Sequence, residues 1–120
     1  MEHQQTRTFE ITGLSATRAH DAPSLIFAKR ICGDVTPAKI VFVDLVVVPP
    51  GAEIGLHTHS VDSREVYIVL SGTGEMRLGP ETIEVGEGSV LANEPGGQHS
   101  LRNIGADDIL MVVIDTKVDR

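Results

Sequence analysis

Residues 51–72 read GAEIGLHTHSVDSREVYIVLSG and combine metal-binding side-chain types with an apolar run of strand length. His57 and His59 are separated by one residue, so on an extended strand both imidazoles point to the same face. Glu65 begins the apolar run, and His99 begins a later run directly after the turn at 95–98. Neutral imidazoles with one carboxylate suit a divalent Fe, Mn, Ni, Zn or Cu ion, whereas Ca²⁺ and Mg²⁺ prefer all-oxygen ligands.

Short runs of β-branched residues lie on both sides of this stretch. Pro, Gly and Ser clusters at 49–51, 71–74, 79–80, 86–88 and 95–97 separate these runs. The runs predict strands at 39–48, 65–70, 75–78, 82–85, 89–92, 99–103 and 109–115. No segment carries an apolar stripe at the helical period over a stable helix length. The pattern therefore predicts an all-β sandwich or barrel in a single domain.

The same residues resemble the two sequence motifs of the cupin superfamily. The first motif places glycine, His-x-His, glutamate and glycine at Gly51, His57, His59, Glu65 and Gly72. The second motif places glycine, glycine, histidine and asparagine at Gly88, Gly96, His99 and Asn103. The chain departs from the family pattern in having Glu94 instead of proline and one extra residue within 60–64. The resemblance implies a double-stranded β-helix, the jelly-roll barrel of cupins.

The resemblance also implies a metal site inside this barrel, near one open end. Its ligands would be His57, His59, Glu65 and His99, holding one divalent transition-metal ion. A six-coordinate ion bound in this way keeps two positions open for water, dioxygen or a chelating substrate. A tetrahedral zinc would instead have a closed, structural shell. A further alternative is a cupin barrel in which the same residues only hydrogen-bond a ligand.

Three more residues are candidates for binding substrate or supporting the metal ligands. Tyr67 lies two residues beyond Glu65 and should point the same way into the barrel, either as packing or to orient a ligand. Gln98 and Asn103 belong to the second motif, beside His99. His3 and His20 have no ligand spacing to another residue, so we expect neither to belong to the site.

Many similar cupins are dioxygenases, isomerases, epimerases or decarboxylases of small organic acids, sugars or their phosphates. The resemblance therefore favours a metal-dependent enzyme acting on a small organic acid, a diketone or a sugar-like metabolite. With no Trp, one Tyr and three Phe, the chain offers few rings on which a sugar could stack, which favours a chelating organic acid. The alternative is a non-catalytic small-molecule-binding or sensor cupin with a metal-assisted or structural site.

Several predicted strands are apolar on both faces, including residues 40–48, 66–70 and 109–114. Both faces must then be covered. We expect residues 38–116 to form the barrel and residues 1–37 to pack on it or on a partner copy. The segment 23–31 or a second copy of the chain would lie across the outer face, which predicts a homodimer.

Charge and composition narrow the possible partners. The formal net charge is −7 over 120 residues, so nucleic acid and anionic membrane surfaces would be repelled. The first twelve residues lack the basic start and apolar run of a secretory signal, and no later stretch has the length of a membrane span, which predicts a cytoplasmic protein. The one cysteine, Cys32, is expected to be a buried apolar residue.

Overall fold

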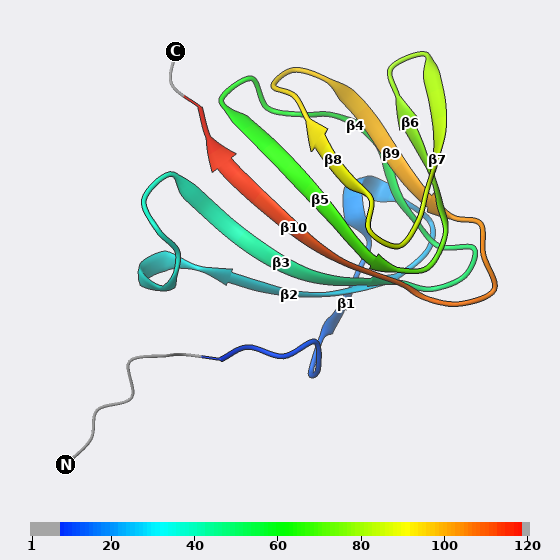
Figure 1. The fold of residues 1–120 in the computed structure, drawn as a ribbon, viewed down its shortest axis with the longest axis horizontal. Coiled ribbons are helices and arrows are strands. Elements are labelled where there is room, and N and C mark those ends of the chain that lie inside the picture. Colours follow the sequence, from blue (N-terminus) through cyan, green and yellow to red (C-terminus); the bar gives the residue numbers. More distant parts are fainter. Residues whose placement is uncertain (1–7, 119–120) are drawn as a thin grey trace.

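The chain folds into two antiparallel β-sheets, shown in Figure 1, and the computed structural model describes residues 8–118. One sheet has six strands in the order β1-β2-β3-β10-β5-β8, and the other has four in the order β4-β9-β6-β7. The strands are β1 (Ser15–Thr17), β2 (Ile26–Cys32), β3 (Ile40–Val48), β4 (Glu53–Thr58), β5 (Ser63–Ser71), β6 (Gly74–Leu78), β7 (Glu81–Val85), β8 (Val90–Asn93), β9 (Gln98–Asn103) and β10 (Ile109–Lys117). Two 3₁₀ turns, η1 (Ala19–Asp21) and η2 (Gly33–Val35), complete the described elements. The all-β double-stranded β-helix is thus confirmed.

The core lies between the two sheets, where side chains from both interdigitate. Along β10 buried residues alternate with half-buried ones, as expected for a strand with one face toward the core. Met111 pairs with Val46 on β3 and with Val69 on β5, so three neighbouring strands present one apolar layer. Met76 and Leu101 from the smaller sheet are fully buried against this layer. These contacts hold the four-stranded sheet over the inner face of the six-stranded one.

Each strand predicted from the sequence is present, with bounds shifted by at most a few residues. The structure adds β4, which carries His57, and the N-terminal strands β1 and β2. Gly72 lies in the turn after β5 with φ of 92°. A Cβ at Gly72 would press on the backbone of Asp108 and Ile109, so this turn requires glycine.

The N-terminal segment extends the larger sheet instead of lying across its face. β2 pairs with β3 from Phe27 opposite Val47 to Cys32 opposite Phe42. The segment adds at the sheet edge because the unpaired backbone groups of β3 offer a ladder of hydrogen bonds there. Cys32 is exposed, so the expectation that it is buried is wrong. The reason is that β1 pairs only with the beginning of β2 and leaves its end uncovered.

After β1 the chain crosses to the smaller sheet through η1. The backbone of η1 approaches β4 so closely at Gly55 that a Cβ there would overlap the carbonyl oxygen of His20. This contact packs residues that precede the main strands against the smaller sheet. No helix within residues 8–118 has the length and apolarity to cross a membrane.

Candidate metal centre

Three side chains on different strands and a fourth just beyond a strand end converge inside the barrel. His57 lies on β4, Glu65 on β5 and His99 on β9, and His59 follows directly after β4. Each offers one ligand atom, and these atoms all lie within 4.8 Å of one another. β4 and β9 bring two of the residues together because His57 pairs with His99 in the antiparallel register. The backbone N–H of His59 donates to the carbonyl of Gly97 at 2.7 Å, which keeps His59 in line beyond the strand end.

Two of the converging atoms are buried without a hydrogen-bond partner among the described residues. Oε1 of Glu65 and Nε2 of His99 are 3.5 Å apart, and neither makes a hydrogen bond. Glu65 is 9% exposed and His99 is 1% exposed. Unsatisfied buried polar atoms are costly, and one shared cation would satisfy both at once. The donor set of three imidazoles and a carboxylate therefore fits a divalent transition-metal ion.

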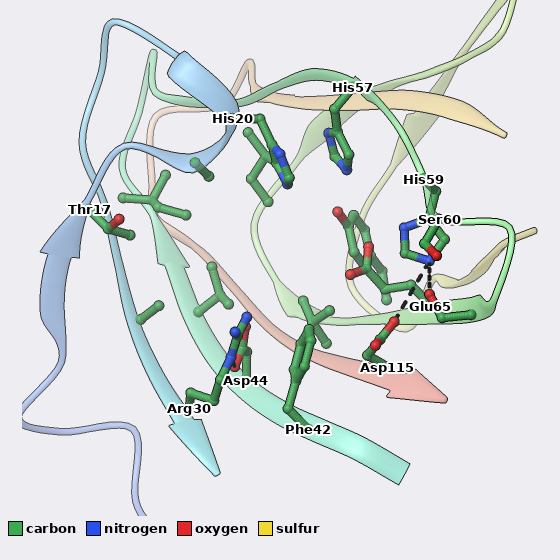
Figure 2. A pocket seen from close by; sticks show the side chains of 18 residues that line it. Thr17, His20, Arg30, Phe42, Asp44, His57, His59, Ser60, Glu65 and Asp115 are labelled. Carbon is green, nitrogen blue, oxygen red and sulfur yellow. Dashed lines mark hydrogen bonds and ion pairs between the residues drawn. The ribbon is translucent and has the colours of Figure 1, made fainter. Parts of the chain in front are cut away.

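Hydrogen bonds orient the two histidines of the His-x-His pair. Nδ1 of His57 donates to the carbonyl of Gly55 at 2.8 Å, which selects the tautomer whose Nε2 has a free lone pair. Nε2 of His59 lies 3.1 Å from Oγ of Ser63 and 3.7 Å from Oδ1 of Asp115. A carboxylate beside one ring nitrogen helps to fix the orientation of an imidazole. Figure 2 shows the contact between the carboxylate of Asp115 and the imidazole of His59 as a dashed line.

Burial and neighbouring charges favour the ligating protonation state at two positions. Burial lowers the pKa of His57 below its ordinary value, although the carbonyl of Gly55 acts in the opposite direction. Burial alone would raise the pKa of Glu65, but His99, His59 and Tyr67 outweigh it and the pKa lies below the ordinary value. A neutral imidazole and an ionised carboxylate are the forms that bind a metal ion.

The three additional candidates from the sequence are placed differently. Tyr67 is 2% exposed, lines a cavity beside the four-residue cluster, and meets the ring of His99 edge-on at 5.8 Å between centroids. Burial raises the pKa of Tyr67 well above its ordinary value, so its hydroxyl stays protonated. Gln98 and Asn103 do not line this cavity. Gln98 is exposed because it neighbours His99 and points to the other face of β9.

Asn103 lies on the same face of β9 as His99, but about 13 Å farther along the strand. Its amide donates to the carbonyls of Val48 and Asp107 and accepts from the backbone N–H of Gly105, each at 2.8 Å. Asn103 therefore holds the connection from β9 to β10 together at the opposite end of the strand.

A cavity of about 660 Å³ opens beside the cluster and reaches residues that the sequence pattern did not indicate. The expectation that His20 lies outside the site is wrong, because its ring stacks on His57 with centroids 3.4 Å apart. Arg30, Phe42 and Asp44 line the far side of the same cavity. His20 and Arg30 come from a segment with no recognisable motif, so no local signal marked them. His3, the other histidine without ligand spacing, lies outside the described residues.

Comparison with known proteins defines the class to which this fold and site belong. The cupin domain family matches residues 44–115, which include all four residues of the cluster. The chain therefore belongs to the cupin family.

Among curated proteins, the chain is 30% identical over 66 residues to an oxalate-binding protein of Thermotoga maritima, covering 55% of this chain and 54% of that protein. It is also 39% identical over 59 residues to an uncharacterized protein of Methanocaldococcus jannaschii, covering 49% of this chain and 46% of that protein. The chain thus spans about half the length of the curated relatives it matches.

Solved structures share the fold at low sequence identity. A predicted oxalate decarboxylase from Thermotoga maritima superposes with a TM-score of 0.83 at 19% identity, covering 93% of this chain and all of that one. A cupin 2 barrel protein from Salinispora arenicola superposes with a TM-score of 0.75 at 19% identity, covering 98% of this chain and 92% of that one. At such identities the likeness concerns the fold alone.

Proposed function

We propose that the chain binds one divalent transition-metal ion through His57, His59, Glu65 and His99 and acts as a metal-dependent enzyme. The observation that carries this proposal is the convergence of four ligand atoms within 4.8 Å, with His57, His59 and Glu65 lining an accessible cavity and His99 buried behind them. A purely structural ion would not need such an opening. When bound, the ion supplies Lewis-acid or redox chemistry at positions that the four side chains leave free.

The substrate is proposed to be a small organic acid, a diketone or a sugar-like metabolite, and the reaction to be of the dioxygenase, isomerase or decarboxylase type. The cavity of about 660 Å³ has the size of a small-molecule site. Within it, Tyr67 keeps a protonated hydroxyl that interacts with Glu65, so it can orient this proposed ligand carboxylate. The name of the Thermotoga maritima relative, an oxalate-binding protein, supports a chelating organic acid.

The second candidate is a non-catalytic small-molecule-binding or sensor cupin that uses the same ion. One observation favours it: the name of that curated relative describes binding and no reaction. In such a protein the ion and the cavity would serve only to hold the ligand.

One experiment tests the proposal in two stages. Tag-free protein is stripped of metal, and its affinity for Fe, Mn, Ni, Zn and Cu ions is measured by calorimetry and elemental analysis. The Glu65→Gln variant should bind each ion far more weakly, while Glu75→Gln, an exposed change of the same type on β6, should not. Equal affinity in wild type and Glu65→Gln would overturn the assigned site.

The loaded protein is then incubated with 2-oxo acids, diketones and sugar phosphates. Metal-dependent turnover of one compound supports the enzyme, whereas tight binding without turnover supports the second candidate.

We also propose that the chain is a homodimer formed through the outer face of the six-stranded sheet. The outward positions of β3 and β10 are half-buried apolar residues, namely Val43, Leu45, Val47, Leu110, Val112 and Ile114. Leu70 and Val90 on the neighbouring strands are 47% and 66% exposed. A continuous apolar face of this kind marks an interaction surface, and a second copy presents the same surface in return.

The remaining expectations from the sequence stay proposals. They are a barrel of residues 38–116 with residues 1–37 packing on it or on a partner copy, a cytoplasmic location, and the absence of nucleic-acid and membrane partners.

A further inference from the structure

A guanidinium is held in place on the side of the cavity that faces away from His20 and His57. Arg30, on β2, donates from Nε and from an Nη to the two carboxylate oxygens of Asp44, each at 2.9 Å. The guanidinium also lies 3.7 Å from the centre of the Phe42 ring. Asp44 and Phe42 project from the adjacent strand β3, and all three side chains line the cavity (Figure 2).

This arrangement fixes Arg30 but does not use all of its donors. A guanidinium has five N–H groups, and the fork with Asp44 occupies one on each of two nitrogens. The hydrogen bond to Asp44 raises the pKa of Arg30, so it keeps its charge. The carboxylate of Asp44 and the ring of Phe42 already hold the guanidinium plane of Arg30. Little side-chain rotamer entropy therefore remains to be lost when a ligand binds to it. The free N–H groups match the oxygens of a carboxylate.

The charges along the cavity determine when an anion can bind there. Asp44, Glu65 and Asp115 contribute carboxylates to the lining, and Arg30 contributes the guanidinium. Carboxylates in this number repel an anionic ligand. A divalent ion held by the histidine cluster would offset that repulsion, so an anion is expected to bind only to the metal-loaded protein.

We propose that Arg30 recognises a carboxylate at the far end of a ligand whose near end chelates the metal ion. The ligand is thus a small organic acid with two separated anionic groups, one of them a chelating oxygen pair. This inference rests on the proposed metal site and narrows the proposed substrate class. It also assigns selectivity to β2, which lies outside the residues matched by the cupin family.

The test compares matched ligands on cobalt(II)-loaded protein, whose visible absorption reports ligand binding at the ion. The pairs are oxaloacetate with 2-oxobutyrate, 2-oxoglutarate with 2-oxovalerate, and 2-oxoadipate with 2-oxohexanoate. Each pair shares the chelating group and the chain length and differs in the distal carboxylate. We expect at least one diacid to bind more tightly than its partner by about tenfold to a hundredfold, the range for a charge-assisted hydrogen bond.

The Arg30→Gln variant should lose this preference while keeping the affinity for the monoacid. The matched control is Lys29→Gln, which removes the same charge from the neighbouring position of β2. Lys29 points to the other face of the sheet and donates to the carbonyl of Glu10, so the control should keep the preference.

Three outcomes would overturn the inference. They are wild-type protein without preference for any diacid, a preference that survives Arg30→Gln, and an equal loss of preference in Lys29→Gln. Cobalt affinity is measured first in every variant. Failure to bind cobalt would defeat the proposed metal site itself, whereas normal cobalt binding without diacid preference would defeat only the role of Arg30.

Discussion

The imidazole rings of His20 and His57 lie face to face, with centroids 3.4 Å apart and planes within 10° of each other. His20 adopts a left-handed backbone with φ of 56°, and Asp21 follows with φ of 59°. Such conformations are costly for residues other than glycine and persist only when surrounding contacts hold them. Here the contacts are the ring stack and the close approach of η1 to Gly55. The N-terminal segment thus contacts the proposed metal ligand His57 directly through the ring of His20.

Removing the His20 ring should weaken metal binding without unfolding the barrel. A stacked aromatic pair contributes about 0.5–1.5 kcal/mol beyond its buried area. His20→Ala is therefore expected to raise the metal dissociation constant about twofold to tenfold, measured by calorimetry. His20→Phe keeps a planar ring and should recover most of the affinity. Equal metal affinity in wild type, His20→Ala and His20→Phe would show that the ring of His20 does not position His57.

Gly55→Ala should displace η1 and lower stability. A methyl group at this position would overlap the carbonyl oxygen of His20 and crowd that of Ala19. Overpacking of this kind costs about 1–3 kcal/mol, measured by urea unfolding of the metal-free protein. Gly86→Ala is the control, because an added Cβ there meets only the carbonyl oxygen of Gly72 at 3.6 Å, an ordinary van der Waals contact. A Gly55→Ala protein as stable as wild type would mean that displacing η1 from β4 costs no stability.

Metal affinity should be constant above about pH 7 and fall as the pH drops below about 6.5, because protons compete for the imidazoles. Burial lowers the pKa of His57, so competition at this ring begins only below the ordinary histidine value. The pKa of Glu65 is also below its ordinary value, so its carboxylate does not compete in this range. Titrations between about pH 5 and 8 at constant ionic strength measure the effect. A flat profile would contradict histidine ligation.

The metal-free protein should lose stability over the same acidic range. The unfolded chain takes up a proton at His57 near pH 6.5, before the folded chain does. Glu65 contributes stability above its unfolded pKa, and this contribution is lost as the pH falls further. Both groups therefore make the free energy of unfolding decrease with falling pH, which thermal unfolding across the range can follow.

Asp115→Asn should change protein stability and metal affinity in opposite directions. Burial raises the pKa of Asp115, so folding disfavours its carboxylate and the ionised form lowers stability at neutral pH. The amide should therefore increase the thermal stability of the metal-free protein. It should also weaken metal binding about tenfold to a hundredfold, since the carboxylate beside Nε2 of His59 is lost. Unchanged metal affinity would show that Asp115 does not support His59.

A charge on the outer face of the six-stranded sheet should disrupt the proposed homodimer. Val112 lies near the middle of that face, between Leu45 on β3 and Ile68 on β5. Light scattering should report a dimer for wild type and a monomer for Val112→Glu. Ile83→Glu, a change at a 36% exposed residue of the smaller sheet, should remain dimeric. A monomeric wild type at micromolar concentration would contradict the proposed interface.

The amino-acid sequence by itself determined the strands, the family and the convergence of four side chains. Strands follow from local patterns of β-branched residues and turn residues, and the period of two places His57 and His59 on one face. The spacing of the glycines, histidines and glutamate resembles the two cupin motifs, and that resemblance implied that the four side chains converge. The same period explains why Gln98 points away from the site, and strand length explains why Asn103 lies too far from it.

Only the tertiary structure decided which residues surround that point. His20 and Arg30 reach the cavity because β2 adds to the edge of β3 and η1 crosses β4 at Gly55, contacts between segments far apart in the sequence. Asp115 meets His59 because β10 pairs with β5. Such contacts depend on how the sheets close into a barrel. Local patterns of residue types do not predict which distant segments then meet.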